Sequence, residues 1–235
     1  MTDLLNGYYY GSTALSKGQS FPPQITDLEK FQTASANIRE AHNQAYNIAK
    51  ANNFLCSISM RLDGVVPELE NKQDDYDAVK DYLSLSIFDL YDKLAWEDQT
   101  VDFHAVETYN SYRVRHGNSN LDYGLDTNVL RTSDSTWVNL FADANLDPVS
   151  LVTSLDTFSE RYDDNLPIIV QSGIADVRND ADPNYSSDWA TFLFDQVMTA
   201  MVSNERVSDI SYRAFCDGFE WNFGYFFGFY DIPVP

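Results

Sequence analysis

Apolar residues near the start of the chain recur at alternating steps of three and four, the spacing of one face of an α-helix. Thr26 and Glu29 open this stretch in the arrangement of an N-terminal capping box. The pattern predicts one helix of roughly 36 residues over 26–62, with Asn52 and Asn53 as the place where it would break. A helix this long predicts an elongated protein, or one that packs against copies of itself. The stripe consists of Leu28, Phe31, Ala34, Ile38, Ala41, Ala45, Ile48, Asn52, Leu55, Ser59 and Leu62.

Further segments carry helical periodicity or helix start signals. The clearest are 74–96, which begins with two aspartates at the positive end of the helix dipole, and 149–162, which follows an Asp147-Pro148 start signal. Shorter helices are predicted over 136–144, from Pro167 to about Asp176, over 188–203 and over 206–216.

Strand signals are confined to two regions. The stretch 101–116 alternates polar and apolar residues, with a phase slip near Ala105 and Val106 that indicates a bulge or a turn, and a short strand over 127–132 would close a hairpin with it. Near the C-terminus, aromatic residues occupy every second position, which predicts one continuous strand over 219–229. This aromatic row consists of Phe219, Trp221, Phe223, Tyr225, Phe227 and Phe229.

These elements predict an α+β fold that is mostly helical, with a long N-terminal helix, a central β-hairpin region and a C-terminal aromatic strand. Three parts are expected along the chain. Residues 1–25 form an extended arm, 26–216 form a helical domain with a hairpin insertion at about 101–132, and 217–235 form the aromatic strand and a Pro-rich tail.

The net charge of the chain limits the kinds of molecule that it is expected to bind. The 235 residues include 36 Asp and Glu against 15 Lys and Arg, a net charge of −21. A field this negative repels phosphate backbones and anionic lipid headgroups, so neither nucleic acid nor a membrane surface is expected as a partner. The N-terminus lacks a signal peptide and no apolar run is long enough for a transmembrane helix, so the expected location is a virion or the cytoplasm.

One acidic loop resembles the opening of a calcium-binding loop, because carboxylate and amide oxygens stand at alternate positions. These candidate metal ligands are Asp180, Asp182, Asn184 and Asp188. The turn position holds Tyr185 instead of glycine and the last position holds Thr191 instead of glutamate, so only weak calcium binding is expected and no other cofactor. The alternative is an acidic loop that leads into the helix capped by Ser187.

Catalytic motifs are absent: the chain has no GxSxG, Walker loop, GxGxxG or HExxH. His104 alternates with Asp102 in the strand-like segment, and with Glu107 these residues could form a metal or acid–base cluster. The competing interpretation is the polar outward face of an amphipathic strand. His42 is expected to be half-exposed on the long helix, near its apolar stripe.

The pattern as a whole predicts a structural subunit of a homo-oligomeric assembly, as in a virus or phage particle, whose partners are copies of itself and neighbouring subunits. The interface would be formed by Tyr8, Tyr9 and Tyr10 of the arm together with the aromatic row. The row could instead be a core strand of one subunit or a membrane-contacting segment. Two other functions stay open: an enzyme or metal-binding protein with an acidic pocket, and an acidic decoy or inhibitor that binds a basic protein surface.

Overall fold

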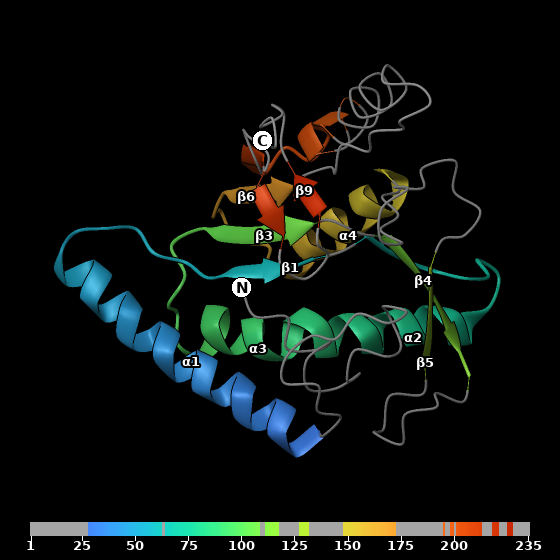
Figure 1. Ribbon diagram of the computed structural model, residues 1–235, viewed down its shortest axis with the longest axis horizontal. Helices are drawn as coiled ribbons and strands as arrows, with labels where there is room; N and C mark the ends of the chain where they lie inside the picture. The colour runs from blue at the N-terminus through green and yellow to red at the C-terminus, as the bar shows by residue number, and fades with distance from the viewer. Residues whose placement is uncertain are drawn as a thin grey trace.

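The computed structural model is described for part of the chain (Figure 1). The described residues are 28–62, 64–108, 111–117, 127–131, 148–172, 195, 198–199, 201–212, 218–220 and 225–227.

The first helix, α1 (Leu28–Ala51), is shorter than the sequence pattern predicts. Asn53 adopts a positive φ of 59°, and the N–H groups of Asn53 and Phe54 donate to the carbonyl oxygens of Lys50 and Ala49. This is a Schellman motif, in which an asparagine in the left-handed region ends the helix. The prediction of one helix to residue 62 is therefore wrong, because the helix ends at the asparagine pair and a strand follows.

The second helical region is confirmed. It runs without interruption through α2 (Gln73–Leu83), the π-helical turn η2 (Ser84–Phe88), α3 (Asp89–Asp92) and a second π-helical turn η3 (Lys93–Glu97). In Figure 1 α1 lies diagonally below this helical run. The apolar side of the helical run from α2 to η3 is buried in the core. The buried residues are Ala78, Tyr82, Leu83, Ile87, Phe88, Leu90, Tyr91 and Leu94.

The largest sheet has four parallel strands in chain order: β1 (Ser59–Arg61), β3 (His104–Thr108), β6 (Ile168–Ser172) and β7 (Val207–Tyr212). Helical segments connect β1 to β3 and β3 to β6, as parallel pairing requires. The predicted helices from Pro167 to about Asp176 and over 206–216 are wrong. Both segments begin as strands, and the apolar run of β6 is typical of a strand buried in a parallel sheet.

A second sheet continues from the first. β2 (Gly64–Pro67) follows β1 and pairs in parallel with β4 (Ser111–His116), which follows β3; β4 then pairs antiparallel with β5 (Thr127–Arg131). The hairpin predicted around residues 101–132 is thus present between β4 and β5. The stretch 101–116 is not one strand, however, because its two halves belong to different sheets.

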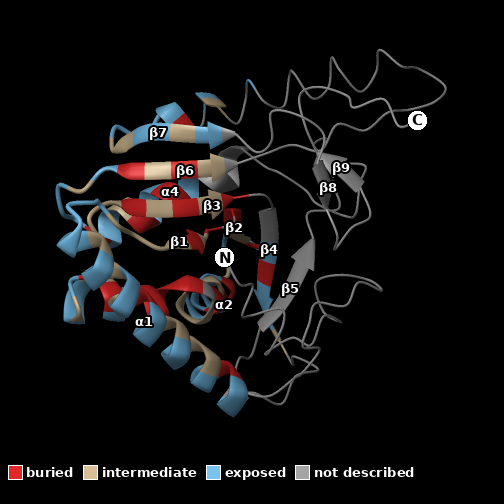
Figure 2. Cartoon of the chain, turned by 60° about the vertical axis from the view of Figure 1, so that its left-hand side comes forward, coloured by how far each residue is buried: buried red, intermediate tan, exposed pale blue. Residues whose placement is uncertain are grey.

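The core lies between one face of the large sheet and the helices. Met60, Val106 and Val170 alternate along the strands and are at most 3% exposed. They share one hydrophobic cluster with α2, α3 and α4 (Pro148–Arg161), the helix predicted from the Asp147-Pro148 signal. Figure 2 shows the four strands side by side, with buried positions alternating along β3 and β6.

The aromatic row does not form one strand. β8 (Gly218–Glu220) and β9 (Tyr225–Phe227) pair antiparallel with each other, with Phe219 opposite Phe226. A period of two is kept by any two strands whose connection spans an even number of residues, so the alternation does not reveal that β8 and β9 are separate strands. The side chains of the row and the N-terminal arm lie outside the described residues.

The topology corrects the fold class to α/β. In doubly wound sheets the strand order reverses once and helices cover both faces, whereas in a (β/α) barrel successive strands are neighbours and all helices lie outside. Here the strand order is sequential, and the described helices share a core with a single face of the sheet. The four strands therefore have the arrangement of a barrel segment.

Candidate functional site

Polar side chains gather where the four parallel strands end. Arg61, Glu107, Gln171 and Ser211 stand at equivalent positions of β1, β3, β6 and β7, as the strand register shows. We call these four residues the polar row. They lie on the face opposite the helices, because their neighbours Met60, Val106 and Val170 face the core. In a barrel this face is the interior, and the carboxyl ends of the strands form the face that carries active sites.

Glu107 is the centre of the polar row. The Oγ of Ser59 donates a hydrogen bond to its Oε1 at 2.9 Å, and the N–H of Leu62 donates to its carbonyl oxygen at 2.8 Å. The side chains of Arg61, Glu107 and Gln171 are half-buried, which limits their motion. Ser59, one layer below on the same face, thus fixes the orientation of the carboxylate.

The polar row combines a carboxylate, an amide, a guanidinium and a hydroxyl group. A carboxylate accepts, a guanidinium donates, and an amide or hydroxyl does both, so the row can satisfy a ligand that has many hydroxyl groups. Hydrogen bonds to the charged members are stronger than those between neutral groups. The row is therefore suited to bind a polyhydroxylated molecule.

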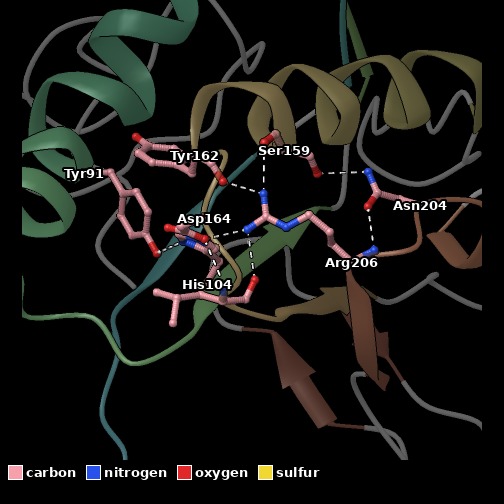
Figure 3. A network of polar contacts seen from close by, with 8 residues as sticks. Tyr91, His104, Ser159, Tyr162, Asp164, Asn204 and Arg206 are labelled. Carbon is pink, nitrogen blue, oxygen red and sulfur yellow. Dashed lines mark hydrogen bonds and ion pairs between the residues drawn. The ribbon is translucent and has the colours of Figure 1, made fainter.

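A second polar network lies at the opposite ends of the same strands (Figure 3). His104, the first residue of β3, is fully buried; its Nε2 lies 2.9 Å from Asp164 Oδ1 and its Nδ1 lies 3.0 Å from the hydroxyl of Tyr91. Because a carboxylate only accepts, Nε2 carries the proton and Nδ1 accepts from Tyr91. The imidazole is therefore held as one neutral tautomer.

Arg206, directly before β7, joins this network to the end of α4. Its guanidinium donates to Asp164 at 2.7 Å, to the carbonyl oxygens of Ser159 and Leu166 at 2.9 Å, and to that of Tyr162. The N–H of Ile168 donates to the carbonyl of Arg206. All these groups lie at the amino ends of the strands, the side of a barrel associated with stability. We therefore infer that the network has a structural role, in which it holds the strands and α4 together.

Burial of His104 makes the network sensitive to pH. Burial lowers the pKa of its imidazole from the usual value near 6.5, against the opposing effect of Asp164. The unfolded chain thus takes up a proton that the folded protein resists, so the stabilising contribution is complete above about pH 6.5 and declines as pH falls below it.

We expect the free energy of unfolding, measured with urea at about pH 7.5 and about pH 5.5, to fall on acidification, and the fall to shrink in His104→Gln. The control is Thr157→Ala, at an exposed position of α4 that carries no titratable group, which should keep the slope of the original protein. Equal slopes in all three proteins would contradict this prediction.

The structure separates the residues of the predicted acid–base cluster. Asp102 accepts from the side chains of Tyr46 and Lys50 on α1 and from the N–H of Cys56. His104 points into the core, and Glu107 lies on the opposite face of β3. No group of three metal-ligating residues occurs among the described residues. The half-exposed position predicted for His42 is also wrong, since it is 8% exposed and bonded to the carbonyl of Thr100.

The other predicted site residues lie where the structure gives no side chains. The proposed calcium ligands Asp180, Asp182, Asn184 and Asp188 fall outside the described residues, as do Tyr8, Tyr9 and Tyr10. Weak calcium binding there stays a prediction. The sequence does not point to Gln171 or Arg61, because the predicted helices cover the segments that carry them. The β-branched run before Gln171 was the signal that could have identified a buried strand.

Solved structures of glycosidases match nearly the whole chain. A beta-glycosidase from Pyrococcus horikoshii has a TM-score of 0.74 and 21% identity over 97% of this chain and 53% of its own. A beta-glucosidase from Trichoderma harzianum has a TM-score of 0.76 and 17% identity over 98% of this chain and 57% of its own. An aphid myrosinase has a TM-score of 0.73 and 18% identity over 97% of this chain and 57% of its own.

These likenesses establish the fold, which is that of (β/α) barrel enzymes described as family 1 glycoside hydrolases. The chain spans about half the length of the solved structures it matches. No protein-family model matches it. A comparison with curated proteins also gives no match.

The comparisons correct the predicted function. The three solved structures described above, which match almost the whole chain, are a beta-glycosidase, a beta-glucosidase and a myrosinase. The prediction of a virion structural subunit is therefore wrong, and a virion location has no support. The two alternatives, an enzyme or metal-binding protein with an acidic pocket and an acidic decoy or inhibitor, do not fit these findings better than the structural subunit does. None of the helices within the described residues combines the length and apolar character of a membrane span.

Proposed function

We propose that this protein binds the sugar ring of a glycoside at the carboxyl ends of its parallel strands and takes part in glycoside hydrolysis. The observation that carries the proposal is the polar row, a carboxylate flanked by a guanidinium and an amide at the end of a barrel sheet. Structures with the same fold are named beta-glucosidases, beta-glycosidases and myrosinase, which supports a glycoside as the ligand.

The row supplies one of the two carboxylates that hydrolysis requires. Most glycosidases use two, one as acid or base and one as nucleophile or base, on either side of the scissile bond. Among the described residues of the row only Glu107 is acidic, and the residue beside it on β6 is Gln171. An amide neither attacks the anomeric carbon as a carboxylate does nor supplies an acidic proton. Hydrolysis therefore needs a second carboxylate from outside the described row.

The test is calorimetric titration with a simple probe, 4-nitrophenyl β-glucoside, on the folded protein and on Glu107→Gln. A hydrogen bond to a charged group is worth about 1.5–3 kcal/mol, so the variant should bind roughly tenfold to a hundredfold more weakly. The control is Glu160→Gln, at an exposed position of α4, which should bind like the original protein. Absence of binding by the original protein, or equal binding by Glu107→Gln, would refute the proposal.

A further inference from the structure

Asp102, which precedes β3, links three parts of the chain. Its carboxylate accepts hydrogen bonds from Tyr46 and Lys50 of α1, at 3.0 Å each, and from the N–H of Cys56, which precedes β1, at 2.8 Å. In return, the N–H of Asp102 donates to the carbonyl oxygen of Cys56 at 3.0 Å. The side chain of Asp102 is 14% exposed, so these contacts are largely sheltered from solvent. One carboxylate therefore joins α1 to the starts of β1 and β3.

The bonds between Cys56 and Asp102 follow the register of the two strands. Ser59 pairs with Ala105, and three positions earlier along each segment stand Cys56 and Asp102. These two residues lie before the ladder begins, and the carboxylate of Asp102 there does the work of a backbone acceptor. The register of the ladder is therefore also fixed by a side chain.

The short strand β1 has few ladder bonds to hold its register. A slip by one residue would turn the buried Met60 to the opposite face, so packing of the core opposes it. A slip by two residues would keep Met60 in the core, but it would move Arg61 about 6.6 Å along the strand from Glu107. The same slip would carry Cys56 out of hydrogen-bond reach of Asp102. The bond between these two residues therefore favours the alignment on which the polar row depends.

We propose that Asp102 is a positioning residue for the polar row, because its carboxylate fixes β1 in register with β3 and so holds Arg61 beside Glu107 at the carboxyl ends of the strands. Asp102 touches no ligand in this role and acts through the pairing of the two strands. The alignment of the row stands on the contacts of Asp102, whereas the effect on glycoside binding rests on the proposed function.

The charged form of Asp102 is the one that these contacts stabilise. Burial alone would raise the pKa of its carboxyl group, but the N–H of Cys56 and the side chains of Lys50 and Tyr46 outweigh burial and hold the pKa below its ordinary value. Hydrogen bonds to a charged acceptor are stronger than those to a neutral one. Removing the carboxylate should therefore loosen β1 more than removing a neutral acceptor would.

The first measurement is hydrogen exchange, followed by nuclear magnetic resonance, at the amide of Leu62. This amide donates to the carbonyl oxygen of Glu107 at 2.8 Å, so it reports on the far end of the strand pair from Asp102. We call it the reporter amide. We expect it to exchange roughly tenfold faster in Asp102→Ala than in the original protein, which corresponds to about 1.4 kcal/mol. Unchanged exchange in this variant would overturn the proposal.

Asp98→Ala is the matched control. Asp98 belongs to the same segment as Asp102, and it holds α1 through Arg39 and Asn43. Its removal weakens the attachment of α1 but leaves the bond between Asp102 and Cys56 in place, so the reporter amide should keep its original rate. If Asp98→Ala accelerates exchange as much as Asp102→Ala, the attachment of the helix is responsible and the proposal is wrong.

Two further variants separate the position of the acceptor from its charge. Asp102→Asn keeps an acceptor oxygen for the N–H of Cys56 and loses the ion pair with Lys50, which is 44% exposed and can turn to solvent. Asp102→Glu keeps the charge but moves the carboxylate one bond further from the backbone, and it takes the place of Asp102→Ala if that variant does not fold. The reporter amide should exchange near its original rate in Asp102→Asn and faster in Asp102→Glu. Any other order would contradict the proposed role.

The last measurement is calorimetric titration of the same variants with 4-nitrophenyl β-glucoside. Affinity should fall roughly tenfold in Asp102→Ala and stay at the original value in Asp98→Ala, with Asp102→Asn close to the original protein. Unchanged affinity in Asp102→Ala, while the original protein binds the glucoside, would show that Asp102 does not position the row. If the exchange results are as expected but the original protein binds no glucoside, the alignment by Asp102 stands and the proposed function is refuted.

Discussion

Replacing Phe158 by alanine should lower the free energy of unfolding by about 3–5 kcal/mol, the usual cost of removing a buried phenylalanine. Phe158 is fully buried on α4 and lies against three rings, with centroid distances of 4.7 Å to Tyr162, 5.4 Å to His104 and 5.7 Å to Tyr91. These rings come from the residue that follows α4, from β3 and from α3, so the cavity would open where the sheet meets α3 and α4. Urea unfolding followed by circular dichroism measures the loss.

The control for this variant is Thr157→Ala, the neighbouring and exposed residue of α4. Its hydroxyl donates to the carbonyl of Thr153 in the same helix, so its loss should change stability by no more than about 0.5 kcal/mol. A cost below 1.5 kcal/mol for Phe158→Ala, near the lower bound for any buried large side chain, would mean that α4 does not pack on the sheet as described.

Replacing Arg206 by methionine should cost about 2–3 kcal/mol, since it removes donors to a carboxylate and to three carbonyl oxygens while keeping a side chain of similar length. The loss should be concentrated in the last turn of α4 and in the loop between α4 and β6, where those acceptors lie. Hydrogen exchange measures it locally: the amide of Ile168, which donates to the carbonyl of Arg206, should exchange faster.

Arg115→Met is the matched control for this variant. Arg115 is exposed on β4 and lies 3.5 Å from Glu68, an ion pair of the kind that contributes at most about 1 kcal/mol. If the two methionine variants lose the same stability, the guanidinium of Arg206 does not hold the amino ends of the strands together.

Local signals in the sequence predicted helices well where capping and periodicity agreed. The helical run from Gln73 and helix α4 begin within a residue of the predicted positions, because an acidic first turn and an Asp-Pro start act on the backbone directly. The strand β6 could not be told from a helix by periodicity, since a strand buried on both faces is apolar throughout. The strands that pair with β6 lie far from it in the sequence, so no local pattern can identify them.

The candidate site was missed for the same reason. The sequence singles out Glu107 as a candidate, but groups it with Asp102 and His104, its neighbours in sequence. Its neighbours in space are Arg61 and Gln171, which share a level of the sheet only because three strands pair in a particular register. The register between strands is set by tertiary packing. A row of polar residues that crosses several strands can therefore be identified only when the pairing of those strands is known.

The sequential order of the parallel strands also shapes how the chain folds. Each strand of the large sheet pairs with the strand that joined the sheet just before it, yet every pairing closes a long loop, as with Ser59 and Ala105 or Ala105 and Ile169. Non-local pairings of this kind make folding slow. During synthesis from the amino terminus, β1 must wait for α2, α3 and β3 before it gains a partner, and each later strand adds one unit to a single advancing edge. The nascent chain therefore carries its least protected surface close to the ribosome for most of its synthesis, and chaperone binding should follow that edge as it moves.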